Sequence, residues 1–156
     1  MLALALALVM TSGDAYALNG MFKGAGTARV VISEPTEAGR ACGVSEGLIE
    51  AAVLGPLGAT TLVLDPPANP DLVLQVNVST VRVTGGDCVS SLSLRVGNTQ
   101  DVKLSFSKIK RSYPILVFEK TGFLASPPPD HGATVATGIG EITKAFAGDY
   151  DLDTRW

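Results

Sequence analysis

Few side chains in this sequence could do acid–base or nucleophilic chemistry: 156 residues include one histidine and two cysteines. His131 follows Asp130 in a Pro-Asp-His-Gly segment. A catalytic histidine needs an orienting acid and a nucleophile, and no Gly-x-Ser-x-Gly motif supplies an activated serine. We therefore predict that His131 is a solvated residue of a loop or helix start and that the chain has no catalytic residue. A hydrolase with an unrecognised site at Asp130 and His131 is kept as a third hypothesis.

Carboxylates at every second position near the end of the sequence could hold a divalent cation. Asp149, Asp151 and Asp153 resemble the first half of an EF-hand calcium loop. That loop also needs glycine at its sixth position, where this sequence has Thr154. We predict an acidic, partly ordered tail after a helix that ends at Gly148, with no metal and no cofactor. A weak cation site at these three aspartates is left as an open question.

The two cysteines have one possible intramolecular pairing, Cys42 with Cys88. An even number of cysteines in an oxidising compartment usually forms structural disulfides. This bridge would close a loop of about 46 residues and stabilise the fold by about 4 kcal/mol in the chain-entropy model. Free buried thiols are the alternative, and redox catalysis is disfavoured because no Cys-x-x-Cys motif is present. We predict the disulfide.

The N-terminal segment indicates export. Residues 1–10 are apolar and uncharged, and an Ala-x-Ala site ends at Ala17. This pattern is typical of a secretory signal peptide, although no Lys or Arg precedes the apolar run. A buried N-terminal strand or helix is the alternative. We predict a signal peptide over residues 1–17 and a periplasmic or secreted protein, because the Ala/Leu-rich segment is bacterial in style.

Composition limits the remaining function classes. The net charge is −3 and only 17% of residues are charged, against roughly 25% in an average soluble domain. A nucleic-acid-binding surface is disfavoured because the chain has no excess of basic residues. No later stretch is long and apolar enough to predict a transmembrane segment. The sequence therefore predicts one domain over residues 18–156, with a flexible lead-in at 18–26.

Hydrophobic periodicity predicts an α+β fold. Period-two patterns indicate strands, and i, i+4, i+7 spacing of Val135, Ile139, Ile142 and Phe146 indicates a helix. In the strand at 71–83 the apolar residues change from even-numbered to odd-numbered positions. This change predicts a bulge near Ser79 and Thr80. We expect an antiparallel sheet of four to six strands with two helices packed on one face. The predicted strands are 27–33, 60–64, 71–83, 88–96, 102–106 and 115–124, with turns at 97–98 and 108–112, a loop at 36–43 and a helix from Ser45.

A cluster of cations and aromatic residues is the best candidate for a binding surface. Such a patch could bind an acidic partner or lipid headgroups, although lysines can also serve to block edge-to-edge strand pairing. Because no catalytic or metal site is evident, we predict a non-enzymatic accessory domain of the bacterial cell envelope that binds a protein partner. The alternative is a periplasmic carrier of a small apolar ligand or lipid, held between Leu74/Val76 and Ile139/Ile142. The cluster comprises Lys103, Phe106, Lys108, Lys110, Arg111 and Tyr113.

Overall fold

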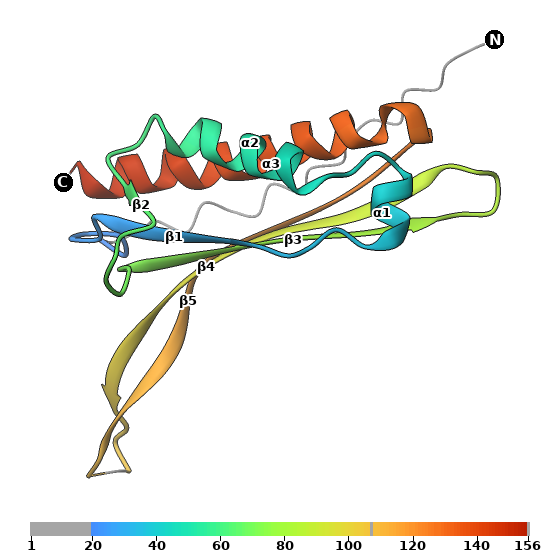
Figure 1. The fold of residues 1–156 in the computed structure, drawn as a ribbon. Helices are drawn as coiled ribbons and strands as arrows, with labels where there is room; N and C mark the ends of the chain where they lie inside the picture. Colours follow the sequence, from blue (N-terminus) through green and yellow to red (C-terminus); the bar gives the residue numbers. More distant parts are fainter. Residues whose placement is uncertain (1–19, 107, 156) are drawn as a thin grey trace.

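The computed structural model describes residues 20–106 and 108–155, which form a five-stranded mixed sheet with helices packed against one face (Figure 1). The strand order is β2-β1-β3-β4-β5. The predicted signal peptide lies outside the described residues. The elements are β1 (Thr27–Ile32), α1 (Glu37–Ala41), α2 (Glu46–Leu57), β2 (Val63–Leu64), β3 (Leu72–Arg82), β4 (Cys88–Lys103), β5 (Lys110–Ser126) and α3 (Pro128–Thr154).

The predicted α+β class is confirmed, and most of the sheet is antiparallel. β3, β4 and β5 form an antiparallel meander, whereas β1 pairs in parallel with both β2 and β3. Parallel neighbours need a crossover connection, and α1 with α2 supplies it between β1 and β2. The short helix α1 occupies the segment that we predicted as a loop, because the Thr36 hydroxyl caps it by accepting a hydrogen bond from Gly39 N–H.

The core lies between the sheet and the two longer helices. Alternate residues of β3 and β4 face α2 and α3, as a half-buried sheet requires. The predicted apolar face of α3 is confirmed. Gly138 lets this helix approach closely, because a Cβ there would lie 2.7 Å from Leu92 Cδ1. The fully or nearly fully buried core includes Phe22, Ile49, Val53, Leu57, Leu72, Leu74, Val76, Leu94, Val135, Ile139, Ile142, Phe146 and Tyr150.

The predicted bulge near Ser79 and Thr80 is wrong. β3 runs without interruption, so Thr80 stays on the buried face and Val81 is 55% exposed. The hydroxyl of Thr80 can occupy this inward position because it hydrogen-bonds to the Ser90 hydroxyl at 2.6 Å. A partnered polar side chain has therefore replaced an apolar one in the alternating pattern.

The predicted turn at Gly97 and Asn98 is also wrong. β4 continues to Lys103, and the irregularity between Val96 and Gly97 is a register shift against β5. Gly97 is needed there because a Cβ would lie 2.8 Å from the Ile115 carbonyl oxygen. The glycine therefore marks a bulge rather than a chain reversal. The reversal comes after Lys103, and β5 begins at Lys110, inside the predicted turn at 108–112.

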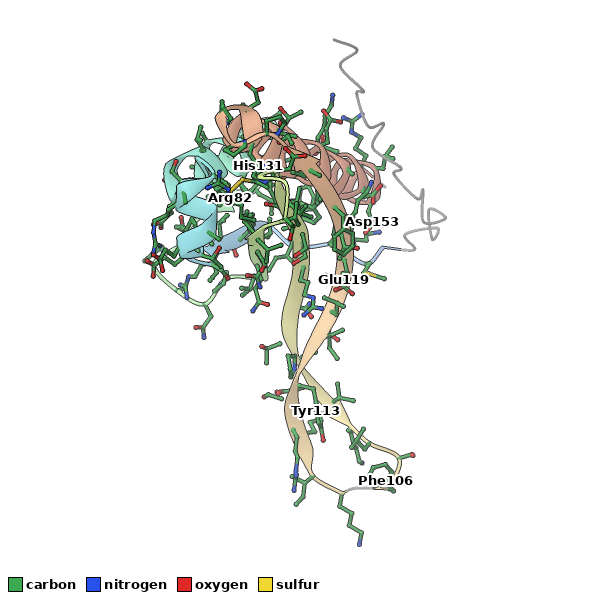
Figure 2. The ribbon with its side chains drawn as sticks, turned by 90° about the vertical axis from the view of Figure 1, so that its right-hand side faces the viewer. Arg82, Phe106, Tyr113, Glu119, His131 and Asp153 are labelled. Atoms are coloured by element: carbon green, nitrogen blue, oxygen red, sulfur yellow. A yellow bond between two sulfur atoms is a disulfide. The ribbon has the colours of Figure 1, made fainter. Side chains whose placement is uncertain are left out.

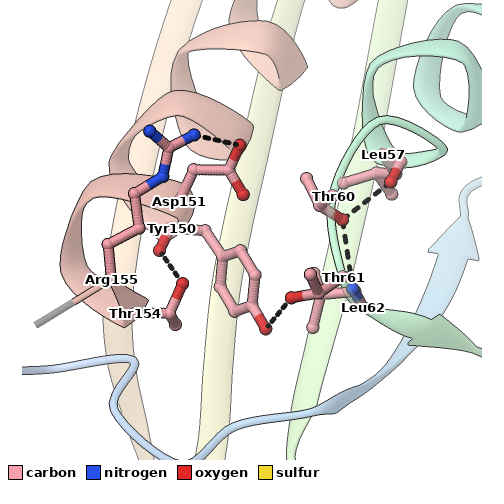
Figure 3. Close-up of polar contacts among 8 residues, drawn as sticks. All are labelled: Leu57, Thr60, Thr61, Leu62, Tyr150, Asp151, Thr154 and Arg155. Atoms are coloured by element: carbon pink, nitrogen blue, oxygen red, sulfur yellow. Dashed lines mark hydrogen bonds and ion pairs between the residues drawn. The ribbon is translucent and has the colours of Figure 1, made fainter.

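The C-terminal helix continues past Gly148, so the predicted helix end and the partly ordered acidic tail are wrong. Tyr150 is buried, and its hydroxyl donates to the Ala25 carbonyl at 2.7 Å. Figure 3 shows the same hydroxyl beside Thr61, together with the Asp151–Arg155 pair. Asp153 accepts hydrogen bonds from the backbone N–H groups of Gly20 and Phe22. The lead-in that we expected to be flexible is thus packed against α3 from Gly20 onward.

The predicted disulfide is confirmed. Cys42 and Cys88 are bonded, with their Cα atoms 6.3 Å apart, so the end of α1 is joined to the start of β4. Beside it, the backbone of Gly132 lies against that of Gly43, where a Cβ on Gly132 would overlap the Gly43 carbonyl oxygen. Among the described residues, no helix is both long and apolar enough to span a membrane.

Candidate functional site

The most distinctive part of the molecule is a two-stranded ribbon that extends away from the rest of the sheet (Figure 1). β3 pairs with β4 only as far as Gly97, so beyond that point β4 and β5 pair with each other alone. We call residues 98–115 the arm and the rest of the described chain the body. No described residue of the arm belongs to the apolar core. Two-stranded ribbons are only marginally stable in water on their own.

The structure brings all six residues of the predicted binding cluster together on this arm. Figure 2 shows Phe106 at its tip and Tyr113 part of the way back to the body. Phe106 is 86% exposed and Tyr113 is half-buried. The four cations are exposed: Lys103, Lys108, Lys110 and Arg111.

Two of the four cations of the arm lie in an unfavourable position. Lys103 and Lys110 are direct cross-strand partners, and like charges directly opposite each other destabilise a strand pair. The one carboxylate of the arm, Asp101, accepts a hydrogen bond from the Ser112 hydroxyl at 2.6 Å. Four of the twelve Lys and Arg residues lie on the arm, but only one of the fifteen Asp and Glu residues does. The arm is therefore positive and the rest of the chain is negative.

His131 belongs to a buried polar network and is not solvated as predicted. Its side chain is fully buried, Nε2 lies 2.8 Å from the Ser90 hydroxyl, and Nδ1 lies 2.8 Å from the Ser126 hydroxyl. Ser90 in turn contacts Thr80. Burial lowers the pKa of His131, because the charged imidazolium loses its hydration. A serine–histidine pair enclosed in this way has no access to a substrate, so the network fixes the start of α3 on the sheet.

The three C-terminal aspartates do not converge on one point. Asp153 binds backbone N–H groups, whereas Asp151 lies 3.9 Å from Arg155. Burial raises the pKa of Asp149, and the positive charge of Lys120 acts in the opposite direction. Within residues 20–106 and 108–155, no group of three His, Cys, Asp or Glu side chains could hold a metal ion.

The face of the sheet opposite the helices has a shallow hollow of about 290 Å³. Phe123, 74% exposed, is one of the residues that line it. The hollow lies on the other side of the sheet from Leu74, Val76, Ile139 and Ile142, which are all buried in the core. Its lining residues are Asn77, Ser79, Ser91, Leu92, Ser93, Thr121 and Phe123.

Two features of these sites were not predicted from the sequence. The first is Ile109, which is 62% exposed near the tip of the arm, and the second is the buried hydroxyl network around His131. The network had a visible signal: Thr80 and Ser90 occupy inward positions of alternating strands, where an apolar residue is expected. An unexpected polar residue at such positions indicates a buried partner.

Comparisons with known proteins identify no family for this chain. No family model matches the chain, and no curated protein matches it. Among solved structures, the chain is similar to a dodecamer of a PelC point variant from Paraburkholderia phytofirmans, with a TM-score of 0.45 and 20% identity. The match covers 78% of this chain and 85% of that one. A likeness this distant says nothing about the function or assembly of the present chain.

Proposed function

We propose that this protein is a non-enzymatic binding domain that works outside the cytoplasm and docks on another component of the bacterial cell envelope through its arm. The observation that carries the proposal is the separation of roles in the fold. The body contains the core and the disulfide, whereas the described residues of the arm contribute nothing to the core and expose cations and an aromatic residue. Exposed Phe, Tyr and Arg side chains are typical of contact surfaces.

The disulfide supports the location. Structural disulfides persist in oxidising compartments and are rare in the cytosol of mesophiles. The bond between Cys42 and Cys88 is fully buried, where it is shielded from reductants and serves the fold. A periplasmic or secreted location agrees with the signal peptide predicted for residues 1–17.

The alternative function, a carrier of an apolar ligand, is less well supported. It requires space between β3 and α3, where Leu74, Val76, Ile139 and Ile142 instead form part of one packed cluster. The hollow on the opposite face is shallow, whereas pockets for small apolar ligands bury most of the ligand's surface. The arm is therefore the better candidate for the functional surface.

Site-specific photo-crosslinking in intact cells tests the proposal. A photoreactive phenylalanine analogue replaces Phe106 in one strain and Phe123 in a matched control strain, since both side chains are largely exposed. We expect adducts to an envelope component from position 106 and far fewer from position 123. Adducts from position 123 with none from position 106 would show that the protein docks through the face of the sheet.

A further inference from the structure

We infer that the partner of the arm is an anionic lipid surface, which the tip enters with its apolar side chains while the cations contact the headgroups. This inference rests on the proposed function, because it names the partner of the same docking element. An acidic protein surface is the competing occupant. Three features of the arm favour the lipid.

The first feature is the order of side chains from the tip towards the body. Phe106 and Ile109 are 86% and 62% exposed at the tip, and cations lie on either side of them and just behind. Interfacial segments place apolar side chains below the headgroups and Lys or Arg at the level of the phosphates. Tyr113 lies further from the tip, on the side of the body (Figure 2). Tyrosine is enriched at membrane–water interfaces.

The second feature is the distance between the tip of the arm and the body. Six residues of β4, Asn98 to Lys103, span about 20 Å at the rise of an extended strand. Electrostatic interactions are largely screened beyond about 8 Å at physiological ionic strength. The negatively charged body therefore stays outside the range in which an anionic surface would repel it, while the positive tip makes contact.

The third feature is that the arm is poorly suited to strand pairing with another protein. Both of its long edges are unpaired along the described residues, but Lys103, Lys110 and Arg111 lie along those edges. Edge cations oppose strand addition, and they repel the arm of a second copy. Contact through the tip, rather than the edges, remains available, and a fluid anionic surface requires no matching pocket.

Vesicle binding of the full chain tests the inference. The vesicles contain equal parts of phosphatidylglycerol and phosphatidylcholine, and vesicles of phosphatidylcholine alone are the control. We expect binding only to the anionic vesicles, and weaker binding at raised salt. The variant with Lys103→Gln, Lys108→Gln, Lys110→Gln and Arg111→Gln should bind several hundred-fold more weakly, at about fivefold for each cation.

Matched variants separate the tip from the body. Phe106→Ala should weaken binding to anionic vesicles about tenfold or more, because the ring leaves water on insertion. Phe123→Ala and Lys144→Gln, which change an exposed aromatic and an exposed cation of the body, should leave binding unchanged. Equal losses in the arm and body variants would overturn the inference.

The remaining outcomes distinguish the inference from the proposed function. If wild-type protein ignores anionic vesicles while position 106 crosslinks to an envelope protein, the lipid inference fails and the docking role of the arm stands. If the protein ignores the vesicles and position 106 gives no adduct in cells, both fail. Thermal unfolding of each variant checks that the body remains folded, which we expect because the core is built from residues outside the arm.

Discussion

The two long strands β4 and β5 run through both the body and the arm, but their surroundings differ between the two regions. Within the body, β4 and β5 are covered by α3, and their inward residues are apolar or hydrogen-bonded. Beyond Gly97 the same strands lose β3 as a neighbour, and their exposed side chains are charged or polar except for Pro114. Body residues form the stable core, and we propose that arm residues contact the partner. At the end of the ribbon Lys103 lies directly opposite Lys110, and this pair of like charges destabilises the pairing of the two strands.

Loss of the disulfide should have a large effect on stability. Replacing both cysteines, Cys42→Ser and Cys88→Ser, should lower the free energy of unfolding by about 4 kcal/mol, because the bond closes a long loop. Urea denaturation measures this. The matched change in the arm replaces residues 99–114 by an Asn-Gly turn and should alter the free energy of unfolding by less than about 1 kcal/mol. A large loss in the shortened chain would show that the arm is part of the stable fold.

A close contact between two backbones gives the next effect. Gly132→Ala should destabilise the protein by about 3 kcal/mol, since the added Cβ would meet the carbonyl oxygen of Gly43. Gly148→Ala is the control in the same helix, where nothing lies within 4 Å of the added Cβ. That control should stabilise α3 by up to about 1 kcal/mol. Similar melting temperatures for the two variants would contradict the packing of α3 against Gly43.

The buried network around His131 predicts a pH dependence of stability. Burial lowers the pKa of His131 below its ordinary value of 6.5, so just below that pH the unfolded chain binds a proton that the folded chain does not. Stability should therefore be constant above pH 6.5 with respect to this group and fall as the pH is lowered below it. Unfolding midpoints across this range measure the slope. His131→Gln should remove this part of it, and an unchanged slope would show that another group is responsible.

The smallest expected effect on stability is at the tip of the arm. Phe106→Ala should change the free energy of unfolding by less than about 0.5 kcal/mol, because its side chain is 86% exposed and outside the core. The free energy of unfolding of this variant is compared with that of Phe146→Ala, which removes a fully buried ring. The buried change should cost about 3–5 kcal/mol. Comparable losses would remove the distinction between the two regions.

Sequence patterns predicted the parts of the fold that depend on local periodicity. The core face of α3, the α+β class and the disulfide follow from spacing, alternation and cysteine number. The parallel pairing of β1 and the end of α3 do not, because they depend on distant partners. Asp153, for example, is buried only because Gly20 and Phe22 return to it across the whole chain.

For the candidate site too, the sequence predicted the residues but not their arrangement in space. The six residues of the cluster were identified from type and proximity in the sequence. Their placement on a projecting arm was not predicted, because the glycine at position 97 suggested a turn. In the structure Gly97 marks a bulge that faces the Ile115 carbonyl. Glycine serves both purposes, and only the pairing of the two strands distinguishes them.

Amide hydrogen exchange in the presence of purified envelope membranes tests the central claim most directly. In the free protein, amides of residues 98–115 should exchange much faster than those of β3 and α3, because the described part of the arm has two unpaired edges and no core. Added membranes should slow exchange in the arm and leave the body unchanged. Protection gained on the face of the sheet around Phe123, with exchange in the arm unaltered, would contradict the account.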